Sequence, residues 1–373
     1  MKLGAKHGES SKHDYAPVHI TKWALRKLKL IEELEMLSAD VFCLQEITER
    51  SLHKTFIPSF KKLGLECAGF GVAKDEKFSK SAPSSSDTMM SRKLLDPRTL
   101  GCAVFCDSNV VKVLSSKRVF LRDFAPLGSS RSEEFSADVH GKTNIMVMLL
   151  LEIIETGKKV VLANTHLFWD PKREDIKTIQ GYAVAGALSK FCEVNGFSTS
   201  DPPPIILCGD FNGMPYRPGN SKNNPSTDAN PAPDSVVADT AVPDSALFEL
   251  LTSGTLPIDH PQHPDRWYTR VIPPLMCPRI GPLSTPWRLR NTFMLTPFVP
   301  FAPAFTTKTN DFAGWIDHIW VDDQQVEVTH TLIPPVCSAD PCASKLFQDF
   351  PPMPNSVTFS YSPCNINSHL YAF

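Results

Sequence analysis

The chain has 373 residues, of which 42% are hydrophobic and 21% charged, an ordinary balance for a globular protein that excludes global disorder. The formal net charge is −2, which excludes a surface that is basic throughout, so any contact with nucleic acid must be local. The hydrophobic run Ile145–Leu151 is too short to span a membrane, and Met1–Lys12 lacks the hydrophobic region of a signal peptide. We therefore expect an intracellular protein without membrane contact, with the cytoplasm as the first choice of compartment and the nucleus or a mitochondrion as alternatives.

The ten cysteines are scattered singly along the chain. Cys43, Cys102 and Cys208 each lie within a hydrophobic run, where a thiol behaves as a small apolar side chain. We expect free thiols rather than a disulfide framework, as is usual for an intracellular protein.

In chain order, the first hydrophobic pattern predicts a helix. From Lys22 to Leu37, hydrophobic residues recur at helical spacing, with Thr21 as a candidate cap. The run Val-Phe-Cys-Leu at 41–44 is short and uninterrupted, which predicts a buried strand. The same pattern then recurs with a strand over 159–163 and a helix over 175–191.

A third pair of elements follows after a long connection. Ile205–Cys208 predicts a buried strand, and Ala246–Leu251 predicts a helix that Gly254 ends. Trp315–Val321 predicts a fourth strand. Buried strands that alternate with amphipathic helices are typical of an α/β core, so α/β is the predicted fold class.

Two polar stretches interrupt this alternation. Residues 77–99 contain three consecutive serines, and residues 213–244 are crowded with Pro, Asn, Asp and Ser. Because the strand pattern resumes after each of them, we predict disordered insertions within a single domain that covers residues 1–373.

Polar residues lie at or near the ends of the predicted strands. In α/β folds, sites form where strand ends from distant parts of the chain converge. A carboxylate flanked by apolar residues also needs a partner or a metal. Taken one at a time, each residue has an ordinary explanation as a helix cap, an ion-pair partner or a core histidine. The residues concerned are Glu46, Asn164, His166, Asp210, Asn212, Asp317 and His369.

The order of these segments resembles that of the endonuclease/exonuclease/phosphatase superfamily. The shared markers are Leu-Gln-Glu at 44–46, Thr-His at 165–166, Gly-Asp-Phe-Asn at 209–212, an Asp before an aromatic or His at 317–318, and a terminal Ser-His at 368–369. Taken together, the five markers are a specific signal, whereas any one of them alone is weak.

Within the superfamily, the resemblance is to the carbon-catabolite-repressor-type deadenylases and their relatives Angel, nocturnin and 2′-phosphodiesterase. Residues 168–180, which contain Phe-Trp-Asp-Pro and then Asp-Ile-Lys, are similar to that group's HWDP…DVK..Q block. Gly-Cys-Ala-Val-Phe at 101–105 resembles the group's GCAIFF strand. Trp169 of the block is expected to lie in the core. The chain carries no leucine-rich repeats for docking into a complex, so it looks like the stand-alone relatives, and its protein partners are unknown.

The resemblance implies a DNase I-like fold, a four-layer sandwich of two packed mixed β-sheets flanked by helices. It also indicates two departures. The family's first strand should lie upstream of Asp14, but the thirteen residues before Asp14 form no hydrophobic run, so we expect that strand to be missing. The family's terminal Ser-Asp-His has Ser368 in the place of Asp, before His369.

By resemblance, the site hydrolyses phosphodiesters with the help of Mg²⁺, or alternatively Mn²⁺. Glu46 would hold the ion, because hard cations take oxygen ligands. Asp210 would orient and deprotonate the attacking water, and Asn212 would position that water or the phosphate. His166 would donate to a non-bridging oxygen in the transition state.

The remaining residues implied by the resemblance would contact the far side of the phosphate and the terminal base. His369 would contact the scissile phosphate, oriented by Asp317. Pro171 and Phe312 occupy the positions that sandwich a terminal adenine in the deadenylases. Asn164 is a further candidate on the substrate side, with a structural role at the strand end as its alternative.

The resemblance therefore implies a Mg²⁺-dependent 3′→5′ exoribonuclease that shortens RNA with an adenosine-rich, poly(A)-like 3′ end. One alternative is another phosphoesterase on the same scaffold, such as a 2′-phosphodiesterase or a terminal-phosphate hydrolase. A second alternative is a catalytically impaired RNA-binding or scaffold protein, which the expected loss of the first strand and the presence of Ser368 would favour.

Overall fold

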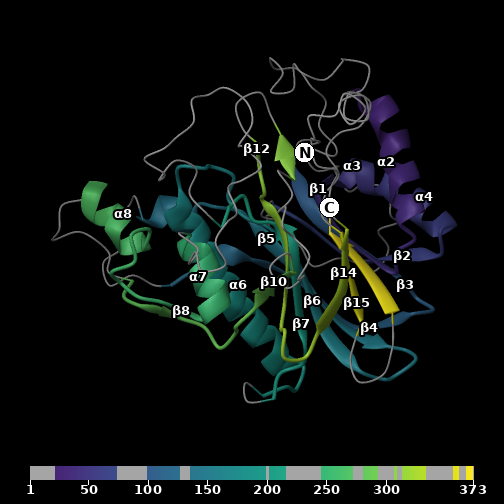
Figure 1. Ribbon diagram of the computed structural model, residues 1–373. Helices are drawn as coiled ribbons and strands as arrows, with labels where there is room; N and C mark the ends of the chain where they lie inside the picture. Colours follow the sequence, from purple (N-terminus) through teal and green to yellow (C-terminus); the bar gives the residue numbers. More distant parts are fainter. Residues whose placement is uncertain are drawn as a thin grey trace, which may run out of the picture.

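The computed structural model describes residues 22–73, 99–126, 135–198, 201–215, 245–271, 280–292, 306–308, 313–332, 356–360 and 367–372. Within these residues, two six-stranded sheets pack face to face, and helices cover both outer faces (Figure 1). The α-helices are α2 Trp23–Leu37, α3 Glu49–Ser51, α4 Ile57–Lys62, α6 Glu174–Val194, α7 Ala246–Ser253 and α8 Pro264–Val271. Shorter helical turns are η1 Leu52–Phe56, η2 Leu121–Phe124 and η3 Ser136–His140.

The first sheet has the strand order β14-β15-β16-β1-β3-β2, and the second has the order β10-β13-β7-β6-β5-β4. Both sheets are mixed, because β1 pairs parallel with β16, and β6 pairs parallel with β7, among antiparallel neighbours. The strands of the first sheet are β1 Val41–Thr48, β2 Leu65–Val72, β3 Leu100–Asp107, β14 Glu327–Leu332, β15 Ser356–Ser360 and β16 Asn367–Ala372. Those of the second are β4 Val111–Phe120, β5 Ile145–Ile153, β6 Lys159–His166, β7 Ile205–Asp210, β10 Arg290–Asn291 and β13 Asp317–Val321. Two small hairpins comprise β8 Thr255–Leu256 with β9 Leu283–Ser284, and β11 Thr307–Lys308 with β12 Ala313–Gly314.

Three hydrophobic clusters correspond to the three interfaces of a four-layer sandwich. The middle cluster lies between the sheets and includes Cys43 of β1 and Leu162 of β6. The second lies between the first sheet and α2 with α4, where the Phe60 ring stacks on Phe105 at 4.2 Å. The third lies between the second sheet and α6 with α7. The predicted α/β architecture of mixed sheets and flanking helices is therefore confirmed.

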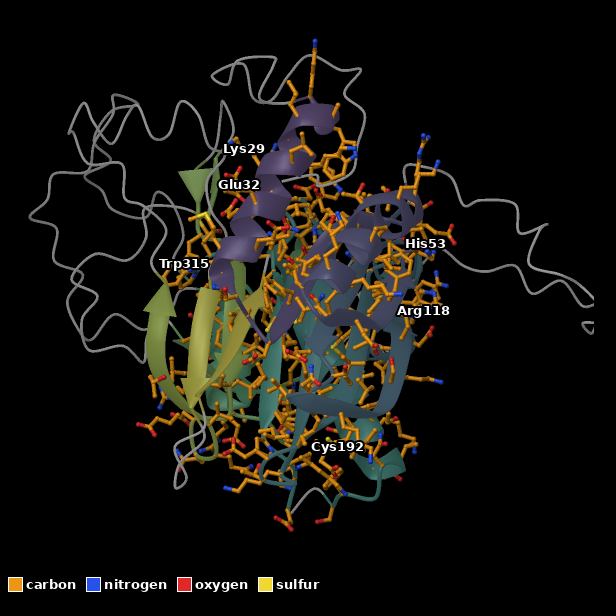
Figure 2. All side chains as sticks on the ribbon, turned by 90° about the vertical axis from the view of Figure 1, so that its right-hand side faces the viewer. Lys29, Glu32, His53, Arg118, Cys192 and Trp315 are labelled. Carbon is orange, nitrogen blue, oxygen red and sulfur yellow. The ribbon has the colours of Figure 1, made fainter. Side chains whose placement is uncertain are left out.

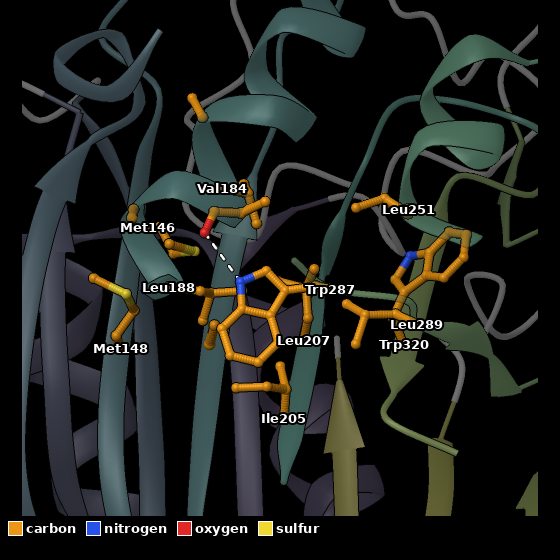
Figure 3. Close-up of a cluster of buried hydrophobic side chains, with 14 of the residues drawn as sticks. Met146, Met148, Val184, Leu188, Ile205, Leu207, Leu251, Trp287, Leu289 and Trp320 are labelled. Carbon is orange, nitrogen blue, oxygen red and sulfur yellow. Dashed lines mark hydrogen bonds between the residues drawn. The ribbon is translucent and has the colours of Figure 1, made fainter. Parts of the chain in front are cut away.

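Figure 3 shows part of the third cluster, in which side chains of β5 and β7 meet α6. Trp287 is 6% exposed, and its indole N–H donates to the Ala185 carbonyl of α6 at 3.1 Å. A buried Trp needs such an acceptor because an unpaired N–H in an apolar layer is costly. The bond anchors the segment that precedes β10 to the helix layer.

The helices and strands expected from the hydrophobic pattern are present. The expected helix at 22–37 is α2, and the strand at 41–44 is the first half of β1. The strands at 159–163 and 205–208 each continue to the polar residues that follow them, which places His166 and Asp210 at strand ends. Gly254 ends α7 in a left-handed conformation with φ 75°, as expected for a C-terminal glycine.

Several expectations concern residues outside the described ranges. Residues 1–21 include the candidate cap Thr21 and the segment in which a first strand was expected to be missing. Most of the predicted insertions 77–99 and 213–244 also lie outside the described residues. The six cysteines within the described ranges are free thiols, as expected. No helix among the described residues is long and apolar enough to cross a lipid bilayer.

His318 is a fully buried histidine of β13 in an aromatic cage. Its ring packs edge-on against Phe248, with ring centroids 4.9 Å apart, and it is 1% exposed. One ring nitrogen lies 3.0 Å from the Asn291 amide nitrogen, and the other lies 3.0 Å from the Gly213 carbonyl. A neutral ring satisfies both contacts, by accepting from Asn291 and donating to Gly213. Burial accordingly lowers the pKa of His318 from 6.5 to about 4.

Stability is therefore expected to fall as the pH is lowered from 6.5 towards 4. In that range the unfolded chain binds a proton at His318 and the folded chain does not. The free energy of unfolding therefore falls, by about 3 kcal/mol in total once the pH is below both pKa values. Urea unfolding with EDTA at pH 7.5 and 4.5 measures this difference. In His318→Gln the pH difference should shrink, whereas exposed His53→Gln should keep it (Figure 2).

The comparison between variants isolates His318 from its neighbour Asp317. The pKa of Asp317 is raised to about 7, so that carboxyl contributes a slope of the opposite sign. An unchanged pH difference in His318→Gln would show that acid destabilisation arises elsewhere.

Candidate active site

Three of the predicted catalytic residues form one row across the second sheet. Asp210 at the end of β7 pairs with Asp317 on the antiparallel strand β13, and with His166 on the parallel strand β6. The His166 Nε2 atom lies 3.4 Å from an Asp210 carboxylate oxygen. In Figure 2 Trp315, which precedes Asp317 by two residues, lies well above Cys192, which is near the end of α6. Side chains from three distant segments thus converge because strand register aligns them.

Gly209 allows β7 to run close to β6 just before Asp210. Its φ is 158°, and a Cβ atom there would lie 2.2 Å from the Thr165 carbonyl oxygen. A side chain at this position would push the two strands apart. The glycine of the Gly-Asp-Phe-Asn motif therefore sets the spacing between His166 and Asp210.

Asn212 closes a tight turn around the Asp210 carboxylate. Its backbone N–H donates to Asp210 Oδ1 at 2.9 Å, and its φ of 50° is left-handed, which asparagine tolerates. Its side-chain amide donates to the Leu167 carbonyl at 3.1 Å. Asn212 thus lies beside the row, and its amide nitrogen ties the loops that follow β6 and β7 to each other.

Glu46 lies at the facing end of the first sheet, on an irregular piece of β1. The β1–β3 pairing shifts register between Leu44 and Ile47, and Glu46 has a left-handed φ of 56°. A bulge with positive φ at a non-glycine residue costs energy, and such strain concentrates at functional sites. The Glu46 Oε2 atom is buried and has no hydrogen-bond partner among the described residues. A buried carboxylate oxygen without a partner is an available ligand for a cation.

The two sheets are tied together directly behind this site by Asn164. Its oxygen accepts from Gln45 at 2.7 Å, and its amide donates to the carbonyls of Leu44 at 3.1 Å and Ala103 at 3.0 Å. Asn164 is 0% exposed. The expectation that it contacts substrate is therefore corrected, because the described contacts occupy its polar atoms and a fully buried side chain offers no surface to a ligand. The structure instead shows the alternative expected for Asn164, a structural role at the end of the strand.

The Gln45–Asn164 bond brings the two strand ends to one level. Gln45 immediately precedes Glu46, and Asn164 lies two residues before His166. Glu46 and Asp210 both lie near enough to the buried Cys102 thiol to raise its pKa, in addition to the larger effect of burial. The Gln45–Asn164 bond therefore places Glu46 at the same end of the sandwich as His166 and Asp210.

Asp317 carries the most strongly perturbed carboxyl of the row. Burial, and then the charge of Asp210, raise its pKa to about 7, while Thr306 and His166 act in the opposite direction. Two carboxylates on adjacent strands resist simultaneous ionisation unless a cation lies between or beside them. A proton or a metal ion is therefore favoured at this end of the sheet.

The loop after His166 is held in place by two residues that strand-end reasoning did not select. Gln180 of α6 accepts from the Phe168 N–H at 2.8 Å and donates to Asn144 at 2.9 Å. Asn144 in turn donates to the His166 carbonyl at 2.8 Å. Gln180 was recognisable only as part of the motif block, and Asn144 only as the polar residue before the Ile145–Leu151 run.

A buried arginine also lies near the site. Arg26 of α2 is 6% exposed, and burial lowers its pKa, while the charge of Glu46 acts in the opposite direction. Nothing in the hydrophobic pattern of residues 22–37 marked Arg26 as a site residue, because helical periodicity does not reveal which strand end a polar side chain meets.

The described residues do not place three further predicted residues in the row. Pro171 is exposed on the loop after His166. Phe312 lies outside the described residues. The backbone of His369 lies in β16, where the next residue, Leu370, pairs with Val41 at the start of β1. At about 3.3 Å per residue, His369 is therefore roughly 20 Å along the strands from Glu46. The structure thus does not bring His369 to Asp317, whose strand neighbour is Asp210.

The residues present fit a magnesium ion bound in the usual way. Among the residues that the structure describes, no three His, Cys, Asp or Glu side chains form a group that could hold a metal. Mg²⁺, however, is commonly held by one or two carboxylates, with waters and substrate phosphates as its other ligands. Glu46, with its unpartnered buried oxygen, fits that requirement.

Comparison with known proteins agrees with this geometry. A family model described as the Endonuclease/Exonuclease/phosphatase family matches residues 18–360. The chain is 25% identical over 351 residues to the CCR4-Not complex 3′-5′-exoribonuclease subunit Ccr4 of Schizosaccharomyces pombe, covering 88% of this chain and 43% of that protein. It is 26% identical over 350 residues to CCR4-NOT transcription complex subunit 6-like-B of Xenopus laevis, covering 88% and 56%. The chain thus spans about half the length of these relatives.

Solved structures share the fold. ANGEL2, a 2′,3′-cyclic phosphatase, superposes with a TM-score of 0.59 at 19% identity, over 93% of this chain and 88% of that chain. The human nocturnin catalytic domain superposes with a TM-score of 0.51 at 16% identity, over 91% and 88%. The family match covers most of the chain and agrees with the shared fold. The chain belongs to the endonuclease/exonuclease/phosphatase family of phosphoesterases.

Proposed function

We propose that the chain is a Mg²⁺-dependent 3′→5′ exoribonuclease that shortens RNA with an adenosine-rich 3′ end. The observation that carries the proposal is the row of His166, Asp210 and Asp317, which lies at the same end of the sandwich as the unpartnered carboxylate oxygen of Glu46. The curated relatives named as 3′-5′-exoribonucleases support the choice of RNA, at about 25% identity.

In the proposed reaction Asp210 is the general base. It takes a proton from a water whose oxygen forms a bond to phosphorus, while the bond from phosphorus to the 3′ oxygen of the shortened RNA breaks. That 3′ oxygen takes a proton from solvent, and a 5′-mononucleotide leaves. His166 donates to a non-bridging oxygen, and Asn212 positions the water or the phosphate. Glu46 would hold Mg²⁺ or Mn²⁺, and the bound ion supplies charge stabilisation for the phosphate oxygens.

Asp317 is assigned a different role from the one implied by resemblance. It adjoins Asp210, and with a pKa of about 7 it carries a proton for much of the time at neutral pH. A protonated Asp317 removes one of two neighbouring negative charges and leaves the role of base to Asp210, which is the usual division of roles in a carboxyl pair. His369 has no part in this proposal because β16 places its backbone at the other end of β1.

For the base, we propose that Pro171 forms one face of an adenine sandwich, with Phe312 as the opposite face. The exposed position of Pro171, five residues after His166, is compatible with a base held next to the scissile phosphate. The alternatives from the same scaffold are a 2′-phosphodiesterase or a terminal-phosphate hydrolase, and a catalytically impaired RNA-binding protein.

A gel time course tests the proposal. The substrate is 5′-labelled RNA with a 3′ oligo(A) tail, incubated with Mg²⁺ or EDTA and compared with oligo(U)-tailed, 2′–5′-linked and 2′,3′-cyclic-phosphate-ended RNAs. Stepwise shortening that requires Mg²⁺, requires Asp210 and prefers adenosine is the expected result. Turnover of only the 2′–5′ linkage or the cyclic end would replace exoribonuclease by that activity. Binding of RNA without any turnover would support the impaired binder.

A further inference from the structure

The loop after β6 exposes a tryptophan beside the proposed catalytic row. Trp169 is 64% exposed, whereas Trp287 and Trp320 are 6% and 0% exposed. Trp169 lies three residues after His166, and the expectation that it is a core residue is wrong. Leaving so large an apolar ring in water forfeits its burial, and exposed tryptophans are enriched at binding surfaces.

The exposure does not arise from a loosely held loop. On the N-terminal side of Trp169, the Leu167 N–H donates to the Asp210 carbonyl at 2.9 Å, and the Phe168 N–H is held by Gln180. On its C-terminal side, the Arg173 N–H donates to the Asp170 carbonyl at 3.1 Å, which forms a turn.

Arg173 itself is fixed by two carboxylates. Its guanidinium makes paired hydrogen bonds to Asp175 at 2.8 and 3.0 Å and to Asp138 at 2.6 and 3.1 Å. It also lies 4.7 Å from the Trp267 ring centre. The loop that carries Trp169 is therefore anchored on both sides, and the ring is presented to solvent by a preorganised backbone.

Two lysines lie near this loop, one next to the Phe168 ring and one further along the chain. The Lys142 ammonium lies 4.4 Å from the centre of the Phe168 ring, which itself lies 6.0 Å from the Trp169 ring. Lys172, three residues after Trp169, is exposed. Its hydrogen bond to the Asp170 carboxylate comes from its backbone N–H and not from its ammonium group. An exposed aromatic ring with lysines near it in the fold and in the chain is complementary to a base and its phosphates.

We propose that Trp169 is a stacking platform for a second nucleobase of single-stranded RNA, with Lys142 and Lys172 contacting the flanking phosphates. This subsite rests on the proposed function and extends it beyond the terminal base assigned to Pro171 and Phe312. With this subsite the protein would bind a strand of RNA rather than a single nucleotide.

Binding is measured first, with EDTA present so that no turnover is required. Titration with oligo(A) of eight nucleotides is expected to quench tryptophan fluorescence, and Trp169→Phe should remove that quench. In anisotropy titrations Trp169→Ala should weaken binding by about 5- to 100-fold, since stacking on an aromatic side chain is worth roughly 1–3 kcal/mol per base. Trp169→Phe should retain most of the affinity. Ile258→Ala, which truncates another exposed apolar residue at 49% exposure, should have no effect.

Charge is tested by salt dependence. Lys142→Ala should reduce the slope of log affinity against log salt by about one. If oligo(A) binds Trp169→Ala as tightly as the unaltered protein, the platform is excluded, and the exposed ring then belongs to another contact.

Kinetics separate this inference from the proposed function. Trp169→Ala should raise KM for oligo(A) RNA while leaving kcat, and the hydrolysis of the base-free diester bis(p-nitrophenyl) phosphate, within about twofold. Equal losses on both substrates would show that Trp169 only supports the fold of the loop and would overturn the platform. Absence of Mg²⁺-dependent hydrolysis by the unaltered protein would instead defeat the proposed function, while the fluorescence result would still decide the subsite.

Discussion

Replacing Asp210 by Asn is expected to lower the turnover of phosphodiesters by about 10²- to 10⁴-fold, the usual contribution of a general base. The amide has the same shape and keeps an oxygen that can accept the Asn212 N–H, so the turn after β7 should survive. What it loses is the capacity to take a proton from water, and the charge that lies 3.4 Å from His166. The measurement is kcat on bis(p-nitrophenyl) phosphate and on oligo(A) RNA, together with Tm.

Asp322→Asn is a closely matched control. Asp322 follows β13 directly, and its Oδ1 accepts the N–H of the second residue after it, Gln324, at 3.1 Å, as Asp210 does with Asn212. Its carboxylate lies at the other end of the paired strands, because the β7 residue paired with neighbouring Val321 is Ile206 rather than Asp210. Full turnover is therefore expected for Asp322→Asn. If Asp210→Asn kept its turnover, the base would have to be another residue; if both variants lost it, the loss would be structural.

Replacing Asn164 by Ala is expected to destabilise the fold by about 3 kcal/mol. The change removes the hydrogen bonds that the Leu44 and Ala103 carbonyls and the Gln45 amide make with Asn164 in the buried middle of the sandwich, and the Gln45 amide keeps only its bond to the Cys43 carbonyl. Each unsatisfied buried group costs roughly 1–3 kcal/mol, partly relieved by relaxation and by water entering the space. The free energy of unfolding from urea titration measures the effect.

Asn109→Ala is the control for Asn164→Ala, because it removes an asparagine side chain that is not buried between the sheets. Asn109 lies in an exposed turn, and its amide donates to Asp107. It should change stability by no more than about 0.5 kcal/mol, as surface substitutions usually do. KM for RNA should be unaltered in the folded fraction of Asn164→Ala. Normal stability with a raised KM would return Asn164 to the substrate side of the site.

Much of this protein follows from local sequence. Uninterrupted hydrophobic runs predict β1, β6 and β7 because a strand covered on both faces needs apolar residues at every position. The polar residues that end those runs mark the site for a related reason, since a strand end is where the apolar layers stop. The role of Gly209, by contrast, is visible only in the structure, where a Cβ atom would lie 2.2 Å from the Thr165 carbonyl oxygen.

The tertiary structure alone decided what each of these residues contacts. Asn164 and Asn212 both follow hydrophobic runs, yet one is fully buried between the sheets, and the other ties the loops that follow β6 and β7. Asp317 adjoins Asp210 rather than His369 because strand register, which spans more than 100 residues of sequence, places them side by side. Trp169 is exposed because hydrogen bonds from two other elements hold its loop away from the core. Local pattern determines which elements form, whereas packing and register between distant elements determine which side chains meet.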